Sequence, residues 1–142
     1  MKVAFATTDF IHIDGHFGST KQMALYEVND TGYQALKPMT FGGNLEQDAS
    51  KQDKLEKLHA KVAALLDCTI VYVLEIGGPA AGRLINKKVT PMKSTSAEQT
   101  IAEVLDKLVQ TLKGNPPPWL RKALQKSSES DLEAALEAVS YT

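Results

Sequence analysis

The sequence contains a single cysteine, Cys68, among its 142 residues. One thiol cannot form an internal disulfide, and it cannot build a zinc or iron–sulfur site that needs several thiolates. Cys68 stands at the start of an apolar run, so we expect it to be buried and inert. A metal or cluster held by this chain would therefore need other ligands.

The sequence has neither an excess of charge nor a long apolar run. It carries 16 Lys and Arg against 17 Asp and Glu, which argues against nucleic acid or an anionic membrane held by bulk charge. No apolar run approaches the ~20 residues of a membrane span. Residues 1–8 hold one basic residue and a short apolar run that ends in polar residues, which is typical of a first strand and not of a signal peptide. We expect a cytoplasmic protein.

The apolar patterning predicts a single α/β core with the order β-β-β-α-β-α-β-α. A meander followed by strand–helix alternation implies a mixed five-stranded sheet with helices on both faces. The turn signal Asn29–Gly32 makes the second and third strands a hairpin, and Pro38 breaks or ends the third strand. The expected strands cover residues 2–8, 23–28, 33–41, 68–74 and 88–93.

Three helices are expected in this core. Ser50 with Asp53, and Ser96 with Gln99, resemble capping boxes that open the first and third helices. The second helix covers Ala80–Asn86, with Pro79 in its first turn, and Gly114 closes the third. The inward stripes are Leu55, Leu58, Val62, Leu65 and Leu66 on the first helix, and Ile101, Val104, Leu105, Leu108 and Leu112 on the third.

A proline run at 116–118 ends the core pattern. We therefore divide the chain into a core of residues 1–114 and a helical C-terminal extension of residues 115–142. The extension has two short helical patterns, Trp119–Lys126 and Ser130–Val139. It could dock on the core, reach a partner or stay mobile, and the sequence leaves these alternatives open.

The loop Thr8–Ser19 follows the first strand and concentrates polar chemistry. His16 is the first candidate ligand, because glycines near it permit close approach and a neutral imidazole suits iron and other transition metals. His12 is a weaker candidate, since a spacing of four in a loop fixes no shared face. Asp9 and Asp14 could orient an imidazole, although turn and cap chemistry is the more common role of such residues.

A second unusual segment, Gly77–Gly82, follows the apolar run 69–74. Backbone amides of Gly77 and Gly78 at a helix start suit an anionic group, and Arg83, Lys87 and Lys88 could add positive charge. The segment matches neither the phosphate-binding loop nor the dinucleotide fingerprint. Small residues could equally serve close helix packing. We expect the two loops to meet at one end of the sheet and form a binding site.

An alternative uses two carboxylates at the ends of neighbouring strands. Asp9 and Glu75 could hold a divalent metal for nuclease or phosphoesterase chemistry, although a third acidic ligand is not identifiable. A further alternative is a purely protein-binding regulator that docks through Trp119–Val139. His59 lies off the apolar stripe of the first helix and is expected on the surface.

Several segments carry a resemblance to a known family. They are Val3-Ala4-Phe5-Ala6-Thr7, Gly15-His16-Phe17-Gly18-Ser19, Tyr26-Glu27-Val28 and Ile76-Gly77-Gly78-Pro79-Ala80-Ala81-Gly82-Arg83-Leu84. Together they resemble the dinitrogenase iron–molybdenum cofactor biosynthesis family over roughly residues 1–112. The glycine-rich segment narrows the likeness towards its NifX branch, and the NafY core domain and the C-terminal part of NifB are related.

The resemblance implies a ribonuclease-H-like core without enzymatic activity. It implies a carrier that binds the iron–molybdenum cofactor or its iron–sulfur precursor. Such a carrier would take the cluster from the scaffold and other biosynthesis proteins that build it, and would pass it to the apo-dinitrogenase that receives it. A histidine of the His-Phe-Gly motif is implicated in holding the cofactor in NafY-type members, and this role maps onto His16 as the metal ligand. The other residues expected to bind the cofactor are His12, Gly77, Gly78 and Arg83.

Overall fold

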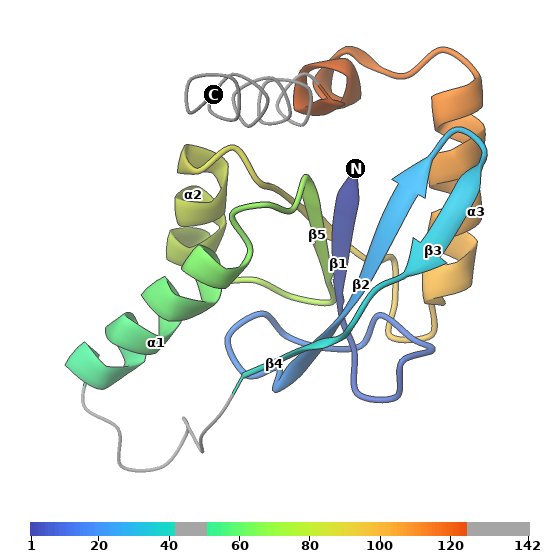
Figure 1. Cartoon of the computed structure of the whole chain (residues 1–142). Coiled ribbons are helices and arrows are strands. Elements are labelled where there is room, and N and C mark those ends of the chain that lie inside the picture. The colour runs from blue at the N-terminus through green and yellow to red at the C-terminus, as the bar shows by residue number, and fades with distance from the viewer. Residues whose placement is uncertain (42–50, 125–142) are drawn as a thin grey trace, which may run out of the picture.

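The computed structural model of this protein describes residues 1–41 and 51–124, with side chains in the second range from residue 56 onward. Three labelled helices and six strands lie within these residues, and a further helical segment covers residues 118–124 (Figure 1). The strands are β1 (Lys2–Ala6), β2 (Gln22–Asn29), β3 (Gly32–Ala35), β4 (Met39–Thr40), β5 (Ile70–Val73) and β6 (Thr90–Lys93). The helices are α1 (Lys51–Ala64), α2 (Gly78–Asn86) and α3 (Ile101–Lys113).

The strands form one mixed sheet in the order β3-β2-β1-β5-β6, with β4 also paired to β2. β1 is parallel to β5 and β5 to β6, whereas β2 is antiparallel to β1, β3 and β4. The predicted mixed α/β sheet and the β2–β3 hairpin are confirmed. The expected number of five strands is wrong, because the third expected strand is divided around Pro38 into β3 and β4. Proline has no N–H to donate to a ladder, which accounts for the break.

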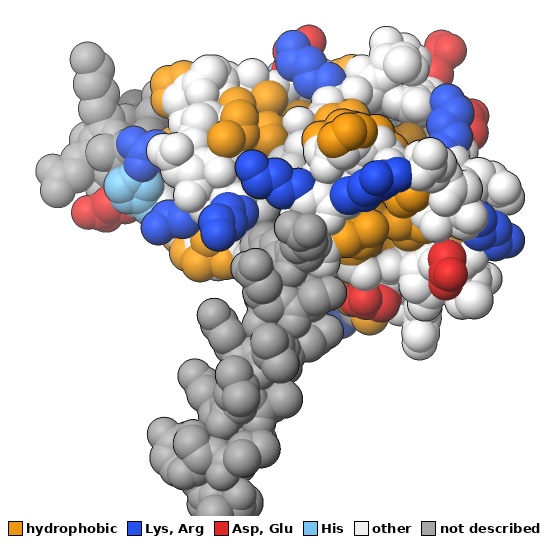
Figure 2. Space-filling model, turned by 90° about the horizontal axis from the view of Figure 1, so that it is seen from above, with side chains coloured by type: hydrophobic (Ala, Val, Ile, Leu, Met, Phe, Trp, Pro, Cys, Tyr) orange, Lys and Arg blue, Asp and Glu red, His pale blue; other side chains and the backbone are white. Residues whose placement is uncertain are grey.

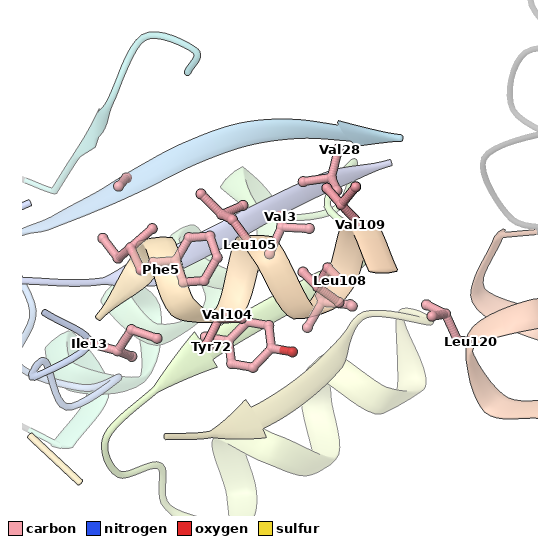
Figure 3. Packing of buried hydrophobic residues seen from close by; sticks show 13 residues of the cluster. Val3, Phe5, Ile13, Val28, Tyr72, Val104, Leu105, Leu108, Val109 and Leu120 are labelled. Carbon is pink, nitrogen blue, oxygen red and sulfur yellow. The ribbon is translucent and has the colours of Figure 1, made fainter. Parts of the chain in front are cut away.

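The central strands are buried on both faces, and their side chains alternate between two apolar clusters. Val3 and Phe5 of β1 belong to the cluster beneath α3, whereas Ala4 and Ala6 belong to the cluster beneath α1 and α2. β5 alternates in the same way, as the period-two geometry of a strand requires. The aromatic ring of Phe5 stacks on that of Tyr72 at 5.2 Å, in the cluster drawn in Figure 3. Helices on both faces are therefore confirmed.

The helix predictions hold in part. Val62 of α1 and Leu65, which follows the last turn of this helix, are buried in the core as expected. Leu66 is 42% exposed, so its expected inward position is wrong. Ser50 and the side chains of Asp53 and Leu55 lie outside the described residues. The predicted capping box at the start of α3 is wrong. Thr100, not Ser96, caps this helix, because its side chain accepts from the backbone N–H of Glu103.

The beginning of the C-terminal extension docks on the core. Residues 118–124 are helical, and Leu120 is fully buried in the α3-side cluster (Figure 3), while Trp119 stays 41% exposed. A cut at residue 114 would therefore expose core surface. The pattern Ser130–Val139 lies outside the described residues. Within residues 1–41 and 51–124, no helix has the length and apolarity to cross a membrane.

Candidate functional site

The loop between β1 and β2 lies at the end of the sheet where the parallel strands β1, β5 and β6 finish (Figure 1). Its middle is tied to β1 and to the end of β5. The backbone N–H of Gly15 donates to the carbonyl of Ala6 at 3.1 Å, and that of Leu74 donates to Gly15 at 2.8 Å. The N–H of Phe17 donates to the carbonyl of Glu75 at 2.8 Å. The loop is therefore an extension of the sheet and not an independent turn.

A second set of hydrogen bonds ties the first half of the loop to the start of α3. The N–H of Ile13 donates to the carbonyl of Gln99 at 2.9 Å, and the N–H of Ile101 donates to that of Ile11 at 2.8 Å. His12 thus lies opposite Thr100, the residue that caps α3. His16 lies opposite Glu75, at the end of β5. The structure anchors the two histidines to two different elements.

His16 is exposed between two buried neighbours, Gly15 and Phe17. Phe17 is fully buried in the cluster beneath α1 and α2, so it anchors this part of the loop in the core. Because adjacent side chains of an extended segment point in opposite directions, burial of Phe17 directs the His16 imidazole outward. An outward imidazole can reach a ligand that arrives from solution.

Glu75 and Lys93 form the charged surroundings of His16. The Lys93 ammonium lies 2.9 Å from the Glu75 carboxylate. This hydrogen bond to Lys93, its positive charge and, to a smaller degree, the charge of His16 lower the pKa of Glu75. Glu75 therefore remains ionised beside His16 at neutral pH, where it can favour a particular orientation of the imidazole.

His12 forms a close pair with Asp9. The Asp9 carboxylate accepts from the backbone N–H groups of Ile11 and His12, and its second oxygen lies 2.6 Å from Nδ1 of His12. Asp14 accepts from the backbone N–H and the hydroxyl of Thr8. The expected turn chemistry of both carboxylates is confirmed. Asp9 additionally orients an imidazole, which leaves Nε2 of His12 as its outward nitrogen.

The Asp9–His12 pair makes a pH-dependent prediction. The hydrogen bond and charge of Asp9 raise the pKa of His12 above 6.5, and the hydrogen bonds from His12 lower the pKa of Asp9 below 3.8. The pair therefore stabilises the fold most at pH values between the ordinary pKa of Asp9, 3.8, and that of His12, 6.5. The contribution of His12 is lost as the pH rises through its folded pKa, and that of Asp9 is lost as the pH falls through its own.

We expect Asp9→Asn to return the pKa of His12 towards 6.5. Titration of the His12 imidazole Cε1 proton by NMR measures this pKa. An unchanged pKa of His12 in the variant would contradict the pairing.

The glycine-rich segment lies beside the loop, because Glu75 pairs with His16 and Gly77 follows two residues later. Gly77 is the N-cap of α2 and Pro79 lies in its first turn, as expected. A Cβ added at Gly78 or Gly82 would meet no atom of the described residues within 4 Å, and one at Gly77 would meet only Pro79 at 4.0 Å. Close helix packing therefore does not require these glycines, which favours the alternative that they leave the helix start open.

The expected cations near this segment are only partly in place. Arg83 lies in the last turn of α2 and is half-buried. Lys87 is the C-cap of α2, and Lys88 follows it. These two lysines therefore lie at the opposite end of α2 from Gly78, and the expectation that they add charge at the site is wrong. Figure 2 views that opposite end, where Lys and Arg side chains gather between apolar patches.

Cys68 lies at the opposite end of the sheet from the loop that carries His16, so it does not take part in the site. It is fully buried and precedes β5, and its neighbour Thr69 donates to the carbonyl of Lys2 at the start of β1. Its predicted burial is confirmed. His16, by contrast, lies beyond the end of β5.

The carboxylates of the nuclease alternative are both engaged with basic groups. Asp9 accepts from His12, and Glu75 from Lys93. In the part of the chain that the structure describes, no three His, Cys, Asp or Glu residues form a group that could hold a metal ion. No contact among these residues favours the alternative.

One residue near the loop was missed by reasoning from the sequence. Lys61 of α1 is 3% exposed, and its ammonium donates to backbone carbonyls of the loop. A signal was present, because Lys61 lies between Leu58 and Leu65 at helical spacing on the apolar stripe. A lysine on a buried stripe is rarely accommodated unless its charge is satisfied.

The family model described as "Dinitrogenase iron-molybdenum cofactor" matches residues 1–111. The chain belongs to this family. It is 42% identical over 129 residues to the protein NifX of Herbaspirillum seropedicae, covering 91% of this chain and 85% of that protein. It is 34% identical over 137 residues to NifX of Rhodobacter capsulatus, covering 96% of this chain and 86% of that protein.

Among solved structures, the crystal structure of PH0822 superposes with a TM-score of 0.56 at 14% identity, over 84% of this chain and 99% of that chain. At this identity the likeness concerns the fold alone. The family match includes both loops of the candidate site, whereas the docked segment 118–124 lies beyond its end. The resemblance noted from the sequence is thereby confirmed at the level of the NifX-like family.

Proposed function

We propose that this protein is a non-catalytic carrier that binds the nitrogenase iron–molybdenum cofactor or its iron–sulfur precursor during cofactor biosynthesis. Membership of the iron–molybdenum cofactor family and similarity to NifX proteins support a role in that biosynthesis. The carrier step itself rests on one observation. The loop presents an outward imidazole, His16, on a backbone anchored to β1 and β5.

The chemistry of the donor set suits a transient cargo. Imidazole nitrogen is a good ligand for iron, and a site with one strong ligand releases its cargo more readily than a site with several thiolates. The backbone amides at the start of α2 suit an anionic cluster, and Arg83, carried on the last turn of the same helix, would add positive charge. His12, whose imidazole is oriented by Asp9, would be a second imidazole on the same loop that contacts the cargo.

The same proposal extends to the fold and the partners. The sheet order with an antiparallel β2 beside β1 is consistent with a ribonuclease-H-like core. The partners would be the scaffold and other biosynthesis proteins that supply the cluster and the apo-dinitrogenase that accepts it, all in the cytoplasm.

Anaerobic titration of the apo-protein with isolated cofactor tests the proposal directly. Ultraviolet–visible absorption and gel filtration should show iron that co-elutes with the protein in stoichiometric amount. A chain ending at Leu124, which keeps Leu120 in place, should bind equally well if the core carries the site. The absence of co-eluting iron with both the cofactor and its precursor would overturn the carrier function.

The same preparation distinguishes the remaining alternatives. Hydrolysis of nucleic acid or a phosphoester with Mg²⁺ or Mn²⁺, in protein that binds no cluster, would point to the metal-dependent enzyme. Loss of binding on truncation at Leu124, in a variant that unfolds like wild type, would assign the function to the C-terminal extension.

A further inference from the structure

Lys61 is a buried lysine whose ammonium contacts the loop that carries His16. Its ammonium donates to the carbonyls of Phe17 at 2.9 Å, Gly18 at 3.3 Å and Thr20 at 3.0 Å. These carbonyls follow His16 directly in the chain. Lys61 itself comes from α1, more than 40 residues later, so this contact joins the loop to the helix layer.

The donors and acceptors of this contact match in number. A protonated lysine has three N–H donors, and three loop carbonyls accept from it. The rings of Phe41 and Phe17 lie 4.9 and 5.7 Å from the ammonium, within the range of a cation–π attraction. Burial lowers the pKa of Lys61 to about 8, so the amine remains largely protonated at neutral pH.

Placing a charged group here is costly for the fold. A hydrophobic residue at this position of the apolar stripe would avoid the desolvation of an ammonium. Phe17 is fully buried and Thr20 is 7% exposed, and the hydrogen bonds that their carbonyls accept from Lys61 lie in the interior. Lys61 therefore satisfies buried acceptors of the loop, and in doing so it fixes the backbone that directly follows His16.

We propose that Lys61 is a positioning residue of the cofactor site, which holds the backbone after His16 so that the imidazole is presented in one orientation. This inference rests on the proposed function, since it assumes that His16 binds the cluster. Lys61 does not itself touch the cargo. Its buried positive charge lies directly beneath the loop and adds to the attraction of an anionic cluster.

The test compares Lys61→Met, Lys61→Arg and, as a matched control on the same helix, Lys57→Met. Cluster affinity is measured by anaerobic titration at a temperature where urea unfolding shows each variant to be fully folded. We expect Lys61→Met to weaken binding by about 10- to 100-fold, the range found when groups that orient metal ligands are removed. Lys61→Arg, which keeps the charge and donors, should restore most of the affinity, and Lys57→Met should bind like wild type.

NMR of the apo-proteins provides a readout that does not depend on the cluster. The amide resonances of residues 17–20 and the His16 ring resonances should shift or broaden in Lys61→Met and return towards wild type in Lys61→Arg. If Lys61→Met does not fold, the comparison of Lys61→Arg with Lys61→Gln, which keeps a donor without the charge, replaces it. Wild-type affinity together with unchanged loop resonances in the neutral variant would overturn the inference. Failure of wild type to bind the cluster would instead overturn the proposed function.

Discussion

Replacing His16 with alanine is expected to weaken cofactor binding by at least about tenfold, which corresponds to about 1.4 kcal/mol. His16 is the residue proposed to ligate the metal of the cargo, so the variant loses that bond. The fold should be unaffected, because His16 is exposed and substitutions at such positions usually change the free energy of unfolding by less than about 0.5 kcal/mol. The measurement is anaerobic titration with gel filtration, alongside urea unfolding.

The chain offers a matched control for this variant. His59 is an exposed histidine on α1, and His59→Ala should bind the cofactor like wild type. Imidazole added to the buffer should partly restore binding to His16→Gly, because it can supply the missing ligand. Unchanged affinity in His16→Ala would contradict the ligand assignment, and a loss in His12→Ala alone would transfer the role to the other histidine.

Replacing Gly15 with alanine is expected to destabilise the protein by about 1–3 kcal/mol, the usual cost of overpacking a filled interior. An added Cβ would lie 2.9 Å from the carbonyl carbon and the Cβ of Ala6. Ala6 is the last residue of the central strand β1, so its backbone cannot move without disturbing the sheet. The loop would have to shift instead, and it would carry His16 away from its anchored position.

Gly18→Ala is the control for this variant, because a Cβ there would meet no described atom within 4 Å. Urea unfolding should place Gly18→Ala close to wild type and Gly15→Ala well below it. Cofactor titration of the folded fraction should show weaker binding for Gly15→Ala only. Equal stability of the two variants would mean that the loop does not need its close approach to β1.

The pattern of apolar residues in the sequence predicted those helices and strands well whose burial requires such a pattern. β1, β5 and α3 read correctly because a strand covered on both faces must be continuously apolar, and a half-buried helix must carry a stripe. The errors came where several local signals competed. Thr100 with Glu103 and Ser96 with Gln99 both resemble caps, and only the pairing of Ile11 and Ile13 with the residues beside Thr100 decides where α3 begins.

The amino-acid sequence by itself determined the class of fold, the candidate histidines and the family. One thiol, a glycine-flanked His16 and a glycine-rich helix start are properties of neighbouring residues, and they can be read without coordinates. The tertiary structure alone decided which groups surround them. Lys61 meets the loop carbonyls, Glu75 pairs with His16 and Cys68 lies at the far end of β5, because such contacts depend on how distant segments of the chain are brought together.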